Sequence, residues 1–181
     1  MTEGPTQDTP DDAALDAALV AELAKKTGVC WLRYGGTTHA AWHVWVSDAL
    51  FVVSGGAEQP LPGIADQART EVVMRSKENG GRLLTWVGSV SVVRPEDELW
   101  EPVTAALVAG RLNLRDLAAA PEEWARNSVV TRIAPTGEYV ERPGSLSDEA
   151  HLAAPAPTPA ITRGRLPRVL HRRGTRRPRL S

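Results

Sequence analysis

The sequence predicts a mainly β fold with added helices (α+β), built as a small barrel of six short strands. Two patterns favour strands: residues 40–56 alternate in character around a tight turn, and two strand-like runs flank Asn79-Gly80. One pattern favours a helix, since leucines recur every four residues over 15–23. Six short strands with few helices favour a barrel, because closing a sheet on itself removes its exposed edges.

The first predicted element is a helix over residues 10–27. Thr9 has the side chain of an N-cap, and Pro10 suits the first helical position. Gly28 follows two lysines and provides the stop. Residues 1–9, ahead of this helix, are expected to be disordered because they are short, polar and acidic.

Six strands are predicted after this helix, over residues 29–34, 39–47, 49–54, 70–76, 82–94 and 128–133. Along the second of them Trp42 and Trp45 point to opposite faces, since side chains alternate along a strand. One face is therefore expected to meet the core, and the other a cavity, a ligand or a second subunit. Gly88, inside the fifth strand, predicts a bulge or a corner where the sheet curls.

Two further helices complete the predicted domain. The first begins near Pro95 with three acidic residues in its first turn, and it buries Trp100, Val103 and Leu107 at helical spacing. A short helix over 121–126 then leads into the last strand. The helix near Pro95 is thus expected to pack on the barrel.

The predicted domain occupies residues 10–135, and residues 136–181 are predicted to be a disordered tail rich in Pro, Ala and Arg. The net charge of −1 conceals two charged poles. Residues 1–24 carry six acidic residues and no Lys or Arg, whereas residues 163–181 carry eight arginines and no acidic residue. Arg163–Arg179 could bind nucleic acid or an anionic surface, pair with the acidic pole, or have no role.

Several classes of function lack their sequence signatures. No apolar run approaches the ~20 residues of a membrane-spanning helix, and the acidic start is unlike a secretory signal, so a cytoplasmic protein is expected. Cys30 is the single cysteine and lies in an apolar run, which predicts a buried filler rather than a nucleophile. No phosphate-binding glycine motif is present, and no metal site is predicted because His39 and His43 would lie about 13 Å apart on a strand.

The order of these elements resembles the FMN-binding split β-barrel of the pyridoxamine 5′-phosphate oxidase-like and flavin/deazaflavin-dependent oxidoreductase families. The match covers about residues 15–135. The composition of the chain resembles that of actinobacterial proteins. The segments that carry it are Trp42–Val46, Leu50–Gly56, Arg82–Gly88 and Asn127–Pro135. The resemblance implies a homodimeric oxidoreductase acting on a small molecule, with FMN or the deazaflavin F420 in a groove between subunits.

The resemblance also implies a set of cofactor-binding residues. Those on the phosphate side are Ser54, Gly55, Gln59 and Arg82, and those on the ring side are His43 and Trp45. The family carries a basic cluster directly after the strand that matches residues 50–54. Here the corresponding segment is Gly55-Gly56-Ala57-Glu58-Gln59-Pro60, which contains no Lys or Arg.

Each of these residues also has a purely structural interpretation. His43 could be a half-buried strand histidine with a hydrogen-bond partner, and Trp42 or Trp45 could pack in the core or against a second subunit. The paired glycines could be the start of an ordinary loop, and Arg82 a solvated hairpin residue. The alternative function is therefore a split barrel that binds or interacts without a cofactor, and a further one is nucleic-acid or anionic-surface binding through the tail.

Overall fold

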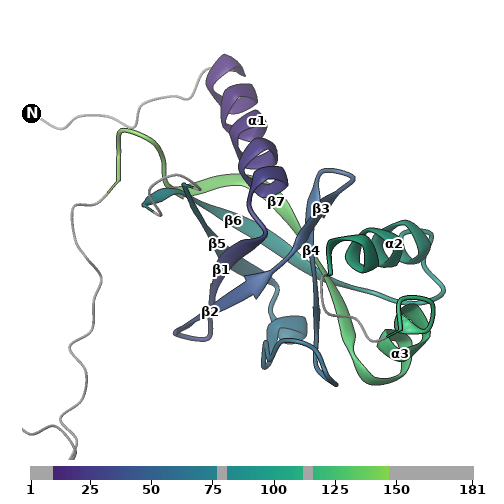
Figure 1. Cartoon of the computed structure of the whole chain (residues 1–181). Helices are drawn as coiled ribbons and strands as arrows, with labels where there is room; N and C mark the ends of the chain where they lie inside the picture. The colour runs from purple at the N-terminus through teal and green to yellow at the C-terminus, as the bar shows by residue number, and fades with distance from the viewer. Residues whose placement is uncertain (1–9, 77–80, 112–115, 147–181) are drawn as a thin grey trace, which may run out of the picture. The chain divides into compact units, whose positions relative to one another are not determined.

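Seven antiparallel strands form one sheet in the computed structural model, which describes residues 10–76, 81–111 and 116–146. The strands are β1 (Val29–Tyr34), β2 (Thr37–Trp42), β3 (Val44–Val46), β4 (Ala49–Ser54), β5 (Arg69–Arg75), β6 (Arg82–Val93) and β7 (Val129–Glu141). Their order across the sheet is β2-β1-β5-β6-β7-β4-β3. The helices are α1 (Pro10–Lys26), η1 (Ile64–Asp66), α2 (Trp100–Gly110) and α3 (Ala120–Asn127), so the described fold is α+β as predicted (Figure 1).

The predicted strand 39–47 is two strands, and the prediction of six strands was therefore wrong by one. β2 and β3 are separated by His43 alone, yet they lie at the two opposite edges of the sheet. A chain can pass from one edge to the other within one residue only if the sheet curls until its edges approach each other. The bend at His43 thus closes the curled sheet, as Figure 1 shows where β2 runs into β3.

The two predicted hairpins are present. β3 pairs with β4 across the turn residues Ser47 and Asp48, whose φ angles of 45° and 55° are those of a turn that matches strand twist. β5 pairs with β6, and the Ser76 amide donates to the Gly81 carbonyl at 2.8 Å. The Asn79-Gly80 pair that predicted this second hairpin lies outside the described residues.

Gly88 marks a register shift, as predicted. Between Trp86 and Gly88 the β6–β7 register shifts, since Trp86 pairs with Tyr139 but Gly88 pairs with Pro135. A Cβ atom at Gly88 would lie 2.3 Å from Cγ2 of Ile133, so the position has no room for a side chain. Glycine therefore lets β6 and β7 approach where the sheet bends.

β7 is longer than predicted. The predicted last strand ended at residue 133 and the predicted domain at residue 135, but β7 continues to Glu141 and pairs there with Thr85. The boundary at 135 therefore falls inside a strand, and the assignment of residues 136–141 to a disordered tail was wrong. Pro135 and the polar residues after it are typical of a strand end, but here the β-bulge accommodates them within β7.

The helices agree with the predicted positions apart from one start. α1 and α3 match within two residues, whereas α2 begins at Trp100 rather than near Pro95. Ahead of α2 the Asp97 carboxylate accepts a hydrogen bond from the Arg94 amide at 2.8 Å, which holds these residues in a turn. Trp100, Val103 and Leu107 are buried, as predicted.

Two hydrophobic clusters share β4 as a common wall. The barrel cluster includes residues of α1 and of the inner face of the sheet, with Leu50 and Val52 from β4. The second cluster lies against α2 and α3 and takes Phe51 and Val53 from the other face of β4. Because both faces are covered, all six residues of β4 are buried, which explains its unbroken apolar run.

Candidate functional site

Both faces of the β2–β3 segment are packed. Trp42, on one face, packs against the cluster under α2 and α3, whereas Trp45 packs on the barrel cluster. The expectation of a core on one face is confirmed, and the other face, expected to meet a cavity, a ligand or a second subunit, also contacts a hydrophobic cluster of the same chain. The indole nitrogens of both tryptophans are buried without a hydrogen-bond partner in the described part of the chain.

His43, assigned to the ring side of a cofactor, is 5% exposed. Its Nε2 lies 3.1 Å from the Ala24 carbonyl, so this nitrogen carries the proton and donates to the last turn of α1. Burial lowers the pKa of His43, which favours the neutral ring. The side chain thereby ties the corner between β2 and β3 to α1.

The glycines after β4 make a turn that packs tightly on the link between α3 and β7. Gly55 and Gly56 have φ angles of 83° and 59°, and a Cβ at Gly56 would lie 2.8 Å from the Asn127 carbonyl oxygen. The Gly55 amide donates to the Gln59 carbonyl at 3.3 Å, and its carbonyl accepts from the Ser128 hydroxyl at 3.1 Å. Ser54, directly before them, is 5% exposed.

Gln59 uses its side-chain amide on the backbone of two strands. Its Oε1 accepts from the Trp42 amide at 2.8 Å, and its Nε2 donates to the Trp42 carbonyl at 2.9 Å and the Val53 carbonyl at 3.2 Å. A side chain with this pattern substitutes for a neighbouring strand at the place where β2 ends. Both amide protons and the oxygen are therefore occupied within the fold.

Glu58 is the centre of a second set of contacts. Its Oε1 accepts a hydrogen bond from Nε1 of Trp124 at 3.0 Å, and its Oε2 lies 3.0 Å from the Arg111 guanidinium. The Arg111 guanidinium also lies 4.9 Å from the centre of the Trp42 ring. We call Glu58, Gln59, Trp42, Arg111 and Trp124 the closure cluster, because they join loop 55–59 to β2, to the end of α2 and to α3.

Arg82 lies at the far end of the sheet from this loop. Ser54 pairs with Val129, and the next residue of β7 pairs with Val93 at the end of β6, whereas Arg82 begins β6. The twelve residues of β6 therefore separate them, on the order of 35 Å at ~3.3 Å per residue. One phosphate group cannot contact both Ser54 and Arg82 of the same chain.

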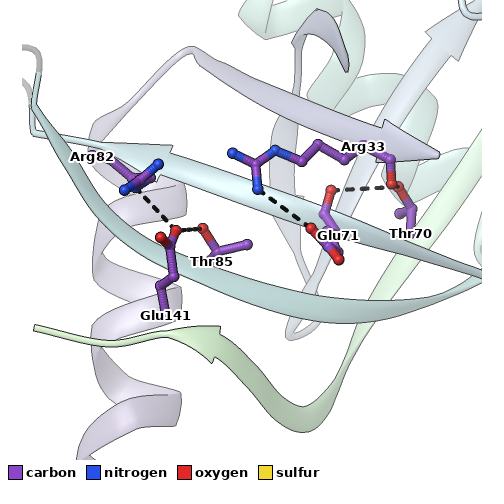
Figure 2. A network of polar contacts seen from close by, with 6 residues as sticks. All are labelled: Arg33, Thr70, Glu71, Arg82, Thr85 and Glu141. Carbon is purple, nitrogen blue, oxygen red and sulfur yellow. Dashed lines mark hydrogen bonds and ion pairs between the residues drawn. The ribbon is translucent and has the colours of Figure 1, made fainter. Parts of the chain in front are cut away.

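The Arg82 charge is also neutralised locally. Its Nε lies 3.0 Å from Oε2 of Glu141, and the Thr85 hydroxyl donates to the same oxygen at 2.7 Å. Figure 2 shows the three side chains together. The Arg82 and Glu141 side chains are 19% and 9% exposed. This pair joins the end of β7 to β6. Glu141, which lies beyond the predicted domain boundary at residue 135, is therefore the partner of Arg82, a predicted site residue.

These placements bear on the fit of a flavin phosphate. A phosphate needs cationic groups or free backbone amides. At loop 55–59 the nearby cation, Arg111, is paired with Glu58, and Gln59 is bonded to backbone groups. Within one chain Ser54 and Arg82 lie too far apart to hold one phosphate, and the cofactor roles of Ser54, Gly55, Gln59 and Arg82 stay predictions.

Sequence reasoning missed the partners of Glu58. Arg111, directly after α2, and Trp124 of α3 are 53 and 66 positions from Glu58. No spacing rule links residues so far apart. The one available signal was an acidic residue in a loop where the resemblance implied a basic cluster.

A metal centre and a membrane-spanning helix are both absent from the described ranges. No group of three or more His, Cys, Asp or Glu residues there could hold a metal ion. Among the helices of residues 10–76, 81–111 and 116–146, none has the length and apolar character needed to cross a bilayer. Cys30 is fully buried, and burial raises the pKa of its thiol to about 12, as suits the predicted filler.

The sequence matches no family model and no curated protein. Solved structures with a similar fold include the haem storage protein HutZ of Vibrio cholerae, with 16% identity over 65% of this chain and 88% of that one, at a TM-score of 0.48. A candidate pyridoxamine 5′-phosphate oxidase of Listeria innocua shares 19% identity over 66% and 93%, at 0.45. An FAD-binding protein of Mesorhizobium loti shares 15% over 68% and 87%, at 0.43. No ligand or activity is carried from them to this chain.

Proposed function

We propose that this chain is a split-barrel binding module in which loop 55–59 closes the barrel and does not hold a flavin phosphate. The observation that carries the proposal is the closure cluster. Glu58 and Gln59 direct every side-chain contact they make at other parts of the fold, namely Trp124, Arg111, Trp42 and Val53.

The charge of the cluster favours the same conclusion. Glu58 and Arg111 form a pair of zero net charge, and the Glu58 side chain is only 6% exposed. A dianionic phosphate beside this pair would be attracted by the Arg111 guanidinium but repelled by the Glu58 carboxylate at a similar distance. If the phosphate drew Arg111 away, the Glu58 carboxylate would be left buried without its cation, which is strongly unfavourable.

A titration with FMN and with F420 tests the proposal. Purified protein is expected to show no flavin or deazaflavin absorbance and no binding of either cofactor at micromolar concentration. Binding of either one at micromolar concentration would overturn the proposal in favour of the oxidoreductase hypothesis. Glu58→Gln is the informative variant, because it leaves Arg111 without its carboxylate; weak binding of inorganic phosphate is expected only in this variant.

Two further expectations from the sequence remain as proposals with their own tests. A homodimer is tested by sedimentation equilibrium, in which a single species of monomer mass would contradict it. Nucleic-acid binding through Arg163–Arg179, which lies outside the described residues, is tested by deleting residues 160–181. Salt-sensitive DNA binding that persists after the deletion would refute a role for the tail.

A further inference from the structure

A polar row crosses three strands at the hairpin end of the sheet. Arg33 of β1 pairs in register with Thr38 of β2 on one side and with Glu71 of β5 on the other. Residues that face each other across antiparallel strands point to the same face and lie about 5 Å apart. A hydroxyl, a guanidinium and a carboxylate therefore stand side by side on one face of the sheet.

A cavity of about 400 Å³ opens at this row. Its lining residues are polar or glycine and come from two neighbouring hairpin strands and β5: Arg33, Tyr34, Gly36, Thr37, Thr38 and Glu71. The volume lies within the ~300–1,000 Å³ of small-molecule sites.

The ion pair in this cavity is open, in contrast to its neighbour in Figure 2. The Arg33 guanidinium meets one oxygen of Glu71 at 3.5 Å, and the two side chains are 31% and 40% exposed. The Arg82–Glu141 pair is shorter, at 3.0 Å, and is far less exposed. A guanidinium has five donors, so Arg33 retains donors for a ligand. A long, exposed ion pair contributes little stability, so a ligand that separates Arg33 from Glu71 loses little free energy.

We propose that this cavity binds a small zwitterion of the free α-amino acid class. Arg33 would take the carboxylate in a two-point contact and Glu71 would take the ammonium group. A simple anion would be repelled by Glu71, and a simple cation by Arg33, whereas a zwitterion satisfies both. Thr38 lines the same space and, in register with Arg33, points to the same face of the sheet, so its hydroxyl can bond either group.

The cavity is separate from the loop that the proposed function concerns. It lies at the Gly36 end of the β1–β2 hairpin, whereas Gln59 is bonded to Trp42 at the other end of β2. The inference therefore goes beyond the proposed function, and a flavin titration and an amino-acid titration can fail independently of each other.

The test is an NMR titration of the ¹⁵N-labelled full chain with each of the twenty L-amino acids. At least one of them is expected to bind with a Kd below about 1 mM and to shift the amides of Arg33, Thr38 and Glu71. Its methyl ester, which lacks the carboxylate, and its N-acetyl derivative, which lacks the ammonium, are expected to bind at least tenfold more weakly. Absence of any binding would overturn the proposal, as would acetate or inorganic phosphate binding as tightly as the amino acid.

Variants locate the site. Arg33→Gln and Glu71→Gln are each expected to weaken binding at least tenfold while the rest of the spectrum keeps its dispersion. Arg69→Gln is the matched control, since Arg69 forms an exposed ion pair with Glu138 and does not line the cavity; its binding is expected to be unchanged. Unchanged binding in both Arg33→Gln and Glu71→Gln would overturn the assignment.

Discussion

At the scale of single residues, Gln59 stabilises the fold through three side-chain hydrogen bonds to the backbone of two strands. Gln59→Ala would leave the amide and carbonyl of Trp42 and the carbonyl of Val53 without their partner. Each unsatisfied, partly buried group costs about 1 kcal/mol or more, so we expect the free energy of unfolding to fall by roughly 2–3 kcal/mol in urea denaturation. Gln67→Ala is the control, because the Gln67 side chain makes one solvent-exposed hydrogen bond, to the Gly63 carbonyl. Equal losses in the two variants would contradict this role of Gln59.

Gly88 gives a second prediction at this scale. In Gly88→Ala the new methyl would lie 2.3 Å from Ile133 and 3.0 Å from the Trp86 ring, both in the barrel cluster. Overpacking of this kind costs about 1–3 kcal/mol, which a urea denaturation curve resolves. Gly28→Ala, where nothing lies within 4 Å of the new atom, is expected to keep wild-type stability. A stable Gly88→Ala protein would mean that β6 and β7 can separate at the bulge.

At the scale of elements, His43 links the β2–β3 corner to α1 and makes their contact sensitive to pH. Burial lowers the pKa of His43 from 6.5. Below pH 6.5 the His43 ring therefore binds a proton in the unfolded chain while it is still neutral in the folded chain. The stabilisation is complete above pH 6.5 and is lost as the pH falls through the lower folded pKa. The slope is at most about 1.4 kcal/mol per pH unit.

The measurement is urea denaturation between pH 8 and pH 5, with His43→Gln as the non-titrating comparison. The wild type is expected to lose more stability than the variant over this range. Parallel curves for the two proteins would show that His43 is not held neutral by the fold.

At the scale of the whole molecule, the end of β7 decides which truncations fold. A chain of residues 1–147 keeps every described contact and is expected to unfold with the same free energy as the full chain. A chain of residues 1–135 loses Tyr139 opposite Trp86 and Glu141 beside Arg82, and is expected not to give a cooperative unfolding transition. Circular dichroism during heating distinguishes the two, and a cooperative transition in the shorter chain would restore the boundary at residue 135.

The same scale separates what local chemistry predicts from what it does not. The positions of α1, α3, β4 and the β5–β6 hairpin were predictable, because caps, turn residues and apolar periods act over a few residues. The division of strand 39–47 at His43 was not, since Trp42–Val46 alternates evenly and contains no glycine or proline. The extension of β7 was not either, because a bulge absorbs residues that elsewhere end a strand.

The sequence by itself determined the class of fold, the tight turns and the unbroken apolar run of β4. Only the tertiary structure decided how the loop after β4 is used. Glu58 looks like an obstacle to phosphate when it is considered within its loop, but curling of the sheet brings it to Trp124 and Arg111, 66 and 53 positions away. The physical reason is that partners so distant in sequence are chosen by the closure of the barrel, and no local pattern encodes that choice.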